Sequence, residues 1–345
     1  TQHHQVGHIT AIRRIEEDRF VRLDKFTIRN LELLGTYHGD GSSLLSVIDR
    51  SLTPMGARLL RRWMLFPLRN VADINSRLDS VEYFFREPEF RDLTHMELSK
   101  VGDLERIVSK VATGRINPRE MQQLRQALET VMVLKRVCCM ADQESIRQLG
   151  ERLAPCQELR QRIERELQAD PPLVVNKGGV ICAGVDTQLD ELREIQTNGK
   201  AYLMRMQERE IQRTGIQSLK IGFNNVFGYY MEVRNTYKEY VPADWIRKQT
   251  LVSAERYITQ ELKEYEEKIL GAEDKIAVLE TRLFVQLVEA AAAVITDLQT
   301  NAQALAELDL YHAMGVLAQS QRYVRPVVDD SPVLDIRGGR HPVIE

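Results

Sequence analysis

A heptad-spaced series of apolar residues runs from residue 258 to residue 283. Its members follow one another in steps of four and three residues: Ile258, Leu262, Tyr265, Ile269, Ala272, Ile276, Leu279 and Leu283. This spacing predicts one continuous helix with a packed seam, about 39 Å long at 1.5 Å per residue. Gly271 lies beside the seam and costs only about 1 kcal/mol of helix propensity, which is too little to end so regular a helix.

Most of the remaining chain also has helical spacing. Residues 44–140 read as successive helices, and two of them begin at a proline that follows a capping residue, Thr53-Pro54 and Asn117-Pro118. A second long helix is expected at 187–212. The chain therefore lacks the regular alternation of strands and helices that is typical of α/β proteins.

A short β-rich segment interrupts this helical pattern. In "SLKIGFNNVFGYYMEVR", Ser218 to Arg234, apolar residues alternate on either side of a polar turn that contains glycine. The segment, roughly 214–252, lies between the two long helices, which must therefore run in opposite directions. We expect a mainly α fold, with a helical core and two long antiparallel helices that carry a small inserted β-rich domain.

The charge of the chain is concentrated in this inserted region. Residues 200–259 hold ten Lys and Arg against six Asp and Glu, a net charge of +4, while the whole chain has a net charge of -3. The remainder therefore carries -7, and a basic patch is expected at the β-rich end. The same region holds nine of the 22 aromatic residues, which we interpret mainly as the core of a small sheet rather than as base-stacking groups.

Two parts of the β-rich region could bind phosphate. The segment "WIRKQTLVSAERY" gathers donors at the predicted turn into the return helix, with Ser253 as a possible helix cap: Arg247, Lys248, Gln249, Thr250 and Ser253. The turn "FNNVFG" offers Asn224 and Asn225. Each has an ordinary alternative, because a solvated turn has similar residues and asparagine favours turns.

Other functional classes receive no support from the sequence. There is no apolar run of membrane-spanning length and no secretory signal, so we expect a cytoplasmic protein. The four cysteines have no metal-binding spacing and are predicted to be buried thiols, and no metal site or catalytic residue is expected. No phosphate-binding loop occurs, because Gly199-Lys200 is preceded by Glu194 where that motif needs glycine.

The sequence resembles the bacterial MutS family of DNA mismatch-repair ATPases over nearly its whole length. The resemblance is carried by several long segments in order: "LDKFTIRNLELLG", "SLLSVIDRSLTPMGARLLRRWMLFPL", "DLERIVSKVATGRINPREMQQLRQAL", "LKIGFNNVFGYYMEV", "RKQTL", "AERYITQELKEYEEKI", "AELDLYHAMGVLA" and "RGGRHPVIE". So many ordered motifs make a chance similarity untenable.

The resemblance implies a division into domains. It implies the end of a connector region at 1–22, a core or lever domain at 23–199 and 260–323, a clamp domain at 200–259, and the start of a truncated ATPase domain at 324–345, with its first strand from about 324. In this family the clamp closes around duplex DNA through the phosphate backbone, and the lever relays motion driven by ATP.

The resemblance also implies the partners and the site. ATP and magnesium would bind in the ATPase domain outside this chain, so we expect no cofactor here and no enzymatic activity of this part alone. A homodimer, a MutL-type partner and association with the nucleoid are implied for the whole protein. The DNA-binding positions implied by the family are Asn224, Arg247, Lys248, Gln249, Thr250 and Ser253.

Two alternatives remain open at this point. The chain could be a helical scaffold whose β-rich region binds another protein through aromatic residues such as Trp245. It could also be a MutS relative that acts on branched DNA, because such a relative would share the lever and clamp. DNA binding that weakens steeply with salt would separate the first alternative from the clamp hypothesis.

Overall fold

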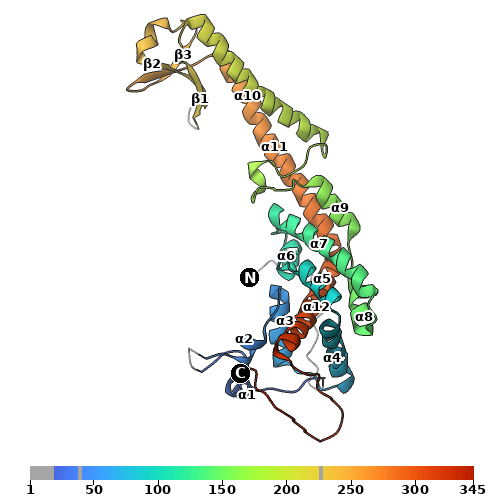
Figure 1. Ribbon diagram of the computed structural model, residues 1–345. Helices are drawn as coiled ribbons and strands as arrows, with labels where there is room; N and C mark the ends of the chain where they lie inside the picture. The colour runs from blue at the N-terminus through green and yellow to red at the C-terminus, as the bar shows by residue number, and fades with distance from the viewer. Residues whose placement is uncertain (1–18, 38–40, 225–227) are drawn as a thin grey trace, which may run out of the picture. The chain divides into compact units, whose positions relative to one another are not determined.

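The computed structural model describes residues 19–37, 41–224 and 228–345, without the side chains of 199–200 and 268–270 (Figure 1). The chain divides into two compact units, as expected for a chain too long for one core. Unit 1 combines Thr1–Arg165 with Gln286–Glu345, and unit 2 is Glu166–Val285. Unit 1 is therefore discontinuous in sequence.

Unit 1 is built from helices. Their bounds are α1 Lys25–Asn30, α2 Leu44–Ile48, α3 Pro54–Leu65, α4 Val71–Arg86, α5 Pro88–Leu98, α6 Leu104–Ala112, α7 Pro118–Cys139, α8 Glu144–Arg152, α9 Gln157–Glu166 and α12 Ile295–Gln321. The two predicted proline-started helices are confirmed. The Thr53 side chain accepts a hydrogen bond from the Gly56 N–H at the start of α3, and Asn117 forms a capping box with Glu120 at the start of α7.

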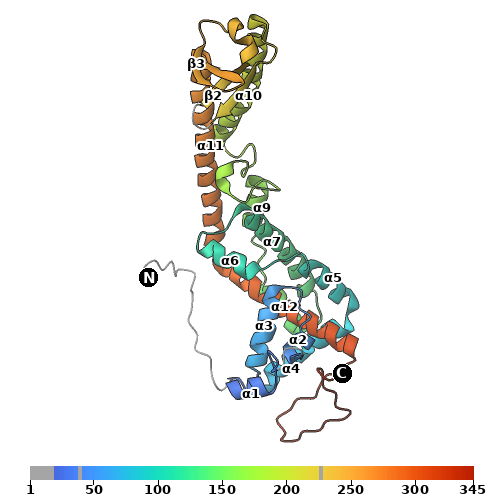
Figure 2. The same cartoon turned by 90° about the vertical axis from the view of Figure 1, so that its left-hand side faces the viewer.

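Helix α12 is the centre of unit 1. It packs against α3, α4, α5, α6 and α8, and Figure 2 shows it among these shorter helices. Because it has neighbours on several sides, most residues between Leu298 and Leu317 are buried, and the helix lacks the polar face of a surface helix.

A buried carboxylate joins α12 to the start of α3. Asp309 accepts hydrogen bonds from the Leu52 N–H at 2.9 Å, from the Thr53 N–H at 2.8 Å and from the Thr53 hydroxyl at 2.7 Å. Gly56 leaves the necessary room, because a Cβ there would lie 2.2 Å from Asp309 Oδ2. The N-terminal end of α3 is thereby fixed against α12.

Unit 2 consists of two long helices and a small sheet. The elements are the 3₁₀ turn η2 Val175–Lys177, α10 Thr187–Thr214, β1 Lys220–Asn224, β2 Gly228–Arg234, the 3₁₀ turn η3 Asn235–Tyr240, β3 Ile246–Thr250, β4 Ala254–Ile258 and α11 Gln260–Ala293, whose last residues belong to unit 1. The mainly α fold with a small β insertion between two long helices is confirmed.

The contacts between α10 and α11 show that they are antiparallel. Arg193 contacts Glu280, the Tyr202 ring stacks on Tyr265 at 3.9 Å, and Arg209 contacts Glu261. The residue number thus rises on α10 as it falls on α11. The two helices lie side by side in both views, with the sheet at the end where α10 stops and α11 begins (Figures 1 and 2).

Four positions of the predicted seam are confirmed and both ends are corrected, while the side chain of Ile269 lies outside the described residues. Leu262, Ala272, Ile276 and Leu279 are buried. Ile258 belongs to strand β4, however, and α11 begins at Gln260, where the Thr259 hydroxyl caps the Leu262 N–H. Toward the other end the buried position moves from Leu283 to Phe284, because a straight helix drifts by about 20° per heptad.

The sheet is antiparallel, with strand order β1-β2-β4-β3. Its core includes Met231, Val233, Trp245, Tyr257 and, from the helices, Leu203, Met206 and Leu262. Tyr202, Tyr229 and Tyr237 pack against this core, so most of the described aromatic residues have the predicted packing role. Phe223 and Tyr240 are exceptions, because both are exposed, and Phe227 lies outside the described residues.

Two further expectations were wrong. No strand forms from residue 324 onward among the described residues, because the backbone of 324–345 pairs with no neighbouring strand. The cysteines are free, but only Cys138 is fully buried, while Cys139 is exposed at the end of α7. Apolar helix spacing did not distinguish these two adjacent positions, which lie on different faces of one helix.

Candidate nucleic-acid interface

The structure places the predicted DNA-binding residues at both edges of the sheet. Arg247, Lys248, Gln249 and Thr250 all lie on β3, which forms one edge, and Asn224 ends β1 at the other edge. Ser253 lies in the turn between β3 and β4. With two strands between them, Asn224 and the β3 residues are about 14 Å apart across the sheet. Asn225 lies outside the described residues.

The local structure around 247–253 differs from the prediction. These residues do not form a turn into the return helix, and Ser253 does not cap that helix. Instead β3 and β4 form a hairpin in which Thr250 pairs with Glu255 and Ile246 pairs with Ile258. Tyr257 and Ile258 are residue types that favour strands, and 254–258 forms β4. The sequence did not reveal this short strand, because the helical spacing of the following segment begins at Ile258.

The β3 residues do not share one face of the sheet. Arg247 pairs with Tyr257 and Thr250 pairs with Glu255, so both lie on the face that bears the buried side chains. Gln249 pairs with Arg256 on the opposite face, and the pairing skips Lys248 at a register irregularity. A flat DNA backbone could not meet all four side chains from one side.

Arg247 takes part in an internal charge cluster. The buried Glu255 carboxylate lies 2.8 Å from Lys238 Nζ and 3.5 Å from Arg247 Nη1, and it accepts a hydrogen bond from the Tyr257 hydroxyl. Lys238 first, and Tyr257 next, hold the pKa of Glu255 below its usual range. Burial raises the pKa of Tyr257 to about 12. Arg247 therefore helps to neutralise a carboxylate of its own sheet.

Gln249 is also engaged, on the opposite face. The Arg256 guanidinium lies 4.1 Å from the centroid of the Tyr230 ring and donates to Glu232 Oε2 at 3.1 Å and to Gln249 Oε1 at 3.0 Å. The Tyr230 ring in turn covers Gly222, where a Cβ would lie 2.9 Å from ring atoms. Arg256 on β4 thus contacts side chains of β2 and β3 directly, and it is linked to β1 through the Tyr230 ring.

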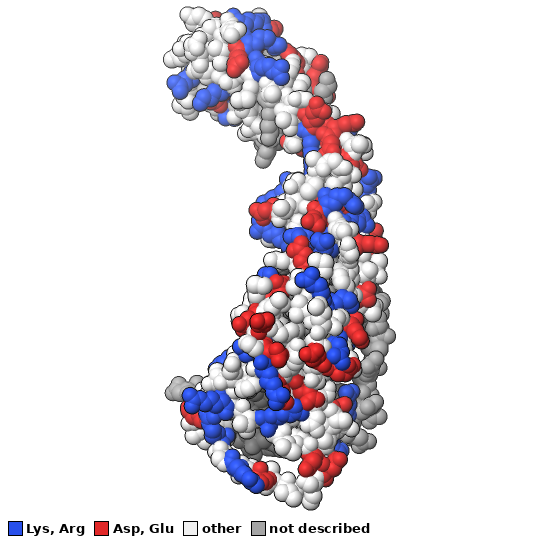
Figure 3. All heavy atoms as spheres, turned by 45° about the vertical axis from the view of Figure 1, so that its right-hand side comes forward, with Lys and Arg blue, Asp and Glu red and all other residues white. Residues whose placement is uncertain are grey.

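Three cations of the sheet remain open to solvent. Lys220 at the start of β1, Arg234 at the end of β2 and Lys248 on β3 are exposed, and none makes an ion pair within the described part of the chain. Figure 3 shows Lys and Arg side chains gathered at the end of unit 2 that carries the sheet. Sequence reasoning selected Lys248 only, because charge counting cannot tell which cations are paired.

The other arginines near the sheet are mostly neutralised. Arg209 pairs with Glu261 at 2.7 Å and Arg213 pairs with Asp244 at 2.9 Å. These contacts fix the ends of α10 against the start of α11 and against the segment before β3. Among the described side chains of 200–259, the exposed cations without an ion pair are Lys220, Arg234 and Lys248 on the sheet and Arg205 on α10, while Arg247 and Lys238 are exposed in part.

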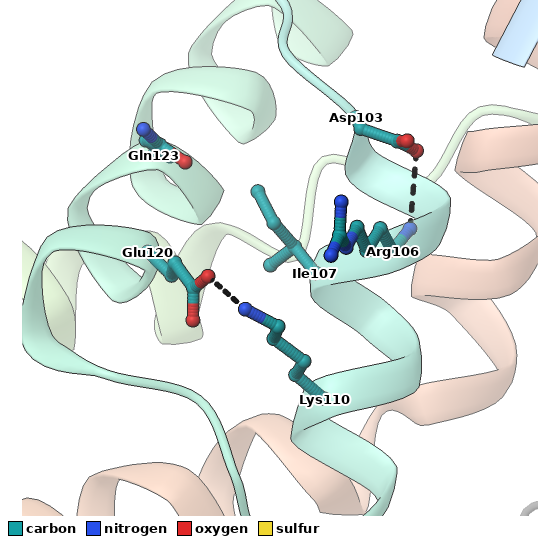
Figure 4. Close-up of a pocket in the computed structure, with 6 residues that line it drawn as sticks. All are labelled: Asp103, Arg106, Ile107, Lys110, Glu120 and Gln123. Carbon is teal, nitrogen blue, oxygen red and sulfur yellow. Dashed lines mark hydrogen bonds and ion pairs between the residues drawn. The ribbon is translucent and has the colours of Figure 1, made fainter. Parts of the chain in front are cut away.

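A shallow cavity in unit 1 offers a less suitable site. It has a volume of about 300 Å³ and lies between α6 and α7 (Figure 4). Lys110 and Glu120 form an ion pair across it, and Asp103 accepts a hydrogen bond from the Arg106 N–H at its edge. Because its lining charges neutralise one another, the cavity shows no surplus of one charge that would select an ionic ligand.

In residues 19–37, 41–224 and 228–345, no group of three or more His, Cys, Asp or Glu side chains is arranged to hold a metal ion. None of the helices in the described ranges is long and apolar enough to cross a membrane.

Comparison with known proteins decides the family. The MutS domain III family matches residues 26–314, which includes all of unit 2. The chain belongs to the MutS family. Three bacterial relatives named DNA mismatch repair protein MutS align with all 345 residues: those of Phocaeicola vulgatus at 61% identity, Bacteroides fragilis at 60% and Porphyromonas gingivalis at 55%.

The chain spans only part of these MutS relatives. It covers 40% of the length of the first two and 39% of the third. The exposed cations of the sheet lie within the segment matched by MutS domain III.

Proposed function

We propose that this chain forms the lever and clamp of a DNA mismatch-repair protein, in which the sheet of unit 2 binds the phosphate backbone of duplex DNA. The observation that carries the proposal is the set of exposed, unpaired cations on the sheet, Lys220, Arg234 and Lys248. Membership of the MutS family supports duplex DNA as the polyanion that they meet.

Phosphate contacts suit this part of a repair protein because they position a protein without reading sequence. Three neutralised phosphates would give a slope of about -2.7 in a plot of log affinity against log salt concentration. Binding by this chain would consequently be weak at physiological salt. Of the six predicted DNA-binding residues, Lys248 fits this role best, while Asn224, Arg247, Gln249, Thr250 and Ser253 stay proposals.

The lever role rests on α11, a helix of 34 residues that is about 51 Å long. In this proposal, ATP and magnesium bind in another region of the protein, and the helix relays the resulting motion to the clamp. The chain itself would then contribute no catalytic residue. The same proposal includes a homodimer and a MutL-type partner for the whole protein. It also includes the clamp domain boundaries at 199/200 and 259/260.

A salt series with labelled duplex DNA tests the clamp. We expect Arg234→Ala with Lys248→Ala to weaken binding at low salt and to reduce the slope by about 2, because two phosphate contacts are lost. Lys177→Ala is a matched control, since Lys177 is an exposed lysine in η2 of the same unit, outside the sheet. If the double variant and the control bind equally well, the sheet is not a clamp.

Arg247→Ala is a poor test of the same idea. Removing Arg247 withdraws a neighbouring positive charge from the buried Glu255, so a loss of binding could arise from a disturbed sheet. The structure therefore favours Arg234 and Lys248 as the positions to change.

The two alternatives have less support. A protein-binding surface built on Trp245 conflicts with the burial of that side chain in the core of the sheet. The relatives are named as mismatch repair proteins, which favours mismatch repair over the processing of branched DNA.

A further inference from the structure

In the turn between β3 and β4, three backbone carbonyl groups have hydrogen-bond partners within the described part of the protein, but two backbone N–H groups do not. Leu251 N–H donates to the Ala254 carbonyl at 2.8 Å, which closes the hairpin. The next two carbonyls are taken by Asn235, whose backbone N–H donates to the Ser253 carbonyl and whose side-chain amide donates to the Val252 carbonyl, both at 3.1 Å. The acceptors of the turn are thus engaged within the protein.

The donors of the same turn are not engaged. Neither the Val252 N–H nor the Ser253 N–H donates to any acceptor within the described residues. Both residues are exposed, and the Val252 side chain is fully exposed, at 101%. Two consecutive N–H groups and the Ser253 hydroxyl are therefore available to a ligand that can only accept hydrogen bonds, and phosphate is such a ligand.

Positive charge adjoins these donors. Arg234 pairs with Ala254 directly beside the turn and precedes Asn235, and Lys248 lies on the strand that enters the turn. Both cations are exposed. An anion at the tip would thus meet neutral donors from the turn and charged groups from the two strands beside it.

We propose that the turn Leu251–Ala254 is a phosphate-binding tip of the sheet, in which Asn235 is the positioning residue that keeps the Val252 and Ser253 N–H groups free for a DNA phosphate. This inference rests on the proposed clamp function and adds the neutral donors and their support. It also assigns a role to Asn235, which neither charge counting nor the spacing of the strands indicates.

Val252→Pro removes one N–H donor of the turn. Among the described residues other than glycine, positive φ angles occur only at Glu32, Cys156 and Arg322, so Val252 is outside the left-handed region that proline cannot adopt. We expect duplex binding to weaken about fivefold, as for one hydrogen bond, with an unchanged salt slope because the N–H carries no charge. Val252→Ala retains the N–H and is expected to bind DNA like the parent chain.

Asn235→Ala tests the positioning role. It should weaken DNA binding by a similar factor without a change in salt slope, because the Val252 carbonyl is released and the turn loses its fixed shape. Asn235→Asp should bind no better than Asn235→Ala, since its carboxylate cannot donate to the carbonyl. The double variant Asn235→Ala with Val252→Pro should lose less DNA affinity than the product of the two single fold-losses, because both substitutions act through the same turn.

Spectroscopy gives a readout that does not depend on these variants folding. In a chain with ¹⁵N-labelled valine and serine, the Val252 and Ser253 amide signals should shift on addition of a short duplex. Unshifted signals, or Val252→Ala weakening binding as much as Val252→Pro, would overturn the phosphate-binding tip. If Arg234→Ala with Lys248→Ala weakens binding while Val252→Pro and Asn235→Ala do not, the tip proposal fails and the clamp proposal stands.

Discussion

Asp309 shows how one buried side chain can fix the start of another helix. Burial raises the pKa of its carboxyl, while hydrogen bonds from Thr53 and Leu52 act in the opposite direction. The three donors that it satisfies are themselves buried or half-buried. The cost of losing Asp309 therefore lies mostly in the partners that would be left without an acceptor.

Asp309→Ala should destabilise unit 1 by about 2 to 4 kcal/mol, because it leaves the Leu52 and Thr53 donors unsatisfied and opens a cavity. Urea unfolding followed by circular dichroism would measure the change. Glu289→Ala, which removes an exposed carboxylate from α11 in the same unit, is the control and should change stability by less than about 0.5 kcal/mol. Equal effects of the two substitutions would contradict the anchoring role.

His312 is another buried polar residue of α12, and its burial affects its pKa. Neither ring nitrogen has a hydrogen-bond partner in the described structure. The ring lies 5.9 Å from Phe84 and 5.2 Å from His95. Burial first, and then the charges of His95 and Arg91, lower the pKa of His312 to about 4.

This depressed pKa predicts acid sensitivity of unit 1. In the unfolded chain a histidine takes up a proton below about pH 6.5, whereas folded His312 resists protonation until about pH 4, so folding stability falls across this window. The loss should be on the order of 3 kcal/mol. His312→Leu should remove this part of the pH dependence, as measured by urea midpoints of both proteins between pH 7.5 and pH 4.5. A constant difference between the two proteins would refute it.

At the scale of elements, the sequence predicted what periodicity and caps determine. The helices that begin at Pro54 and Pro118, the long helix α10 and the four buried positions of the α11 seam all follow from residue spacing and capping residues. These features depend on neighbours within one or two turns, so a single sequence contains them.

Strand pairing was harder to predict because its partners are distant or ambiguous in sequence. The sequence of the β3–β4 hairpin also fits a turn followed by a helix start, since Ile258 belongs to the heptad series as well as to the strand. The sequence therefore predicts the binding residues at a helix start, whereas they lie on a hairpin. Only the pairing of Arg247 with Glu255 and of Arg256 with Glu232 shows which cations are occupied.

Helix α11 provides a test of intrinsic helix propensity. A Cβ added at Gly271 would meet no atom within 4 Å, so Gly271→Ala should stabilise the chain by about 0.5 to 1 kcal/mol through lower backbone entropy in the unfolded state. Gly222→Ala should act in the opposite direction, because its Cβ would press on the Tyr230 ring at 2.9 Å. Urea midpoints of the two variants should therefore move apart, and a shared direction would be inconsistent with this account.

At the scale of the whole molecule, net positive charge is concentrated around the sheet rather than over the whole of unit 2. Residues 200–259 have a net charge of +4 and the rest of the chain -7, so a polyanion should be attracted to the sheet more than to the remaining chain. Family membership was predictable from the sequence because its motifs span both units. The pairing of individual charges could not be predicted from the sequence, since the ion pairs form between residues that only the folded sheet brings together.

The discontinuity of unit 1 has a consequence for synthesis on the ribosome. Helices α3 to α8 are made early, yet α12, against which most of them pack, follows only after the whole of unit 2. At bacterial elongation rates this delay is on the order of ten seconds. During that time the nascent chain exposes apolar faces that will later cover α12, so slow translation of 166–285 should increase its dependence on chaperones.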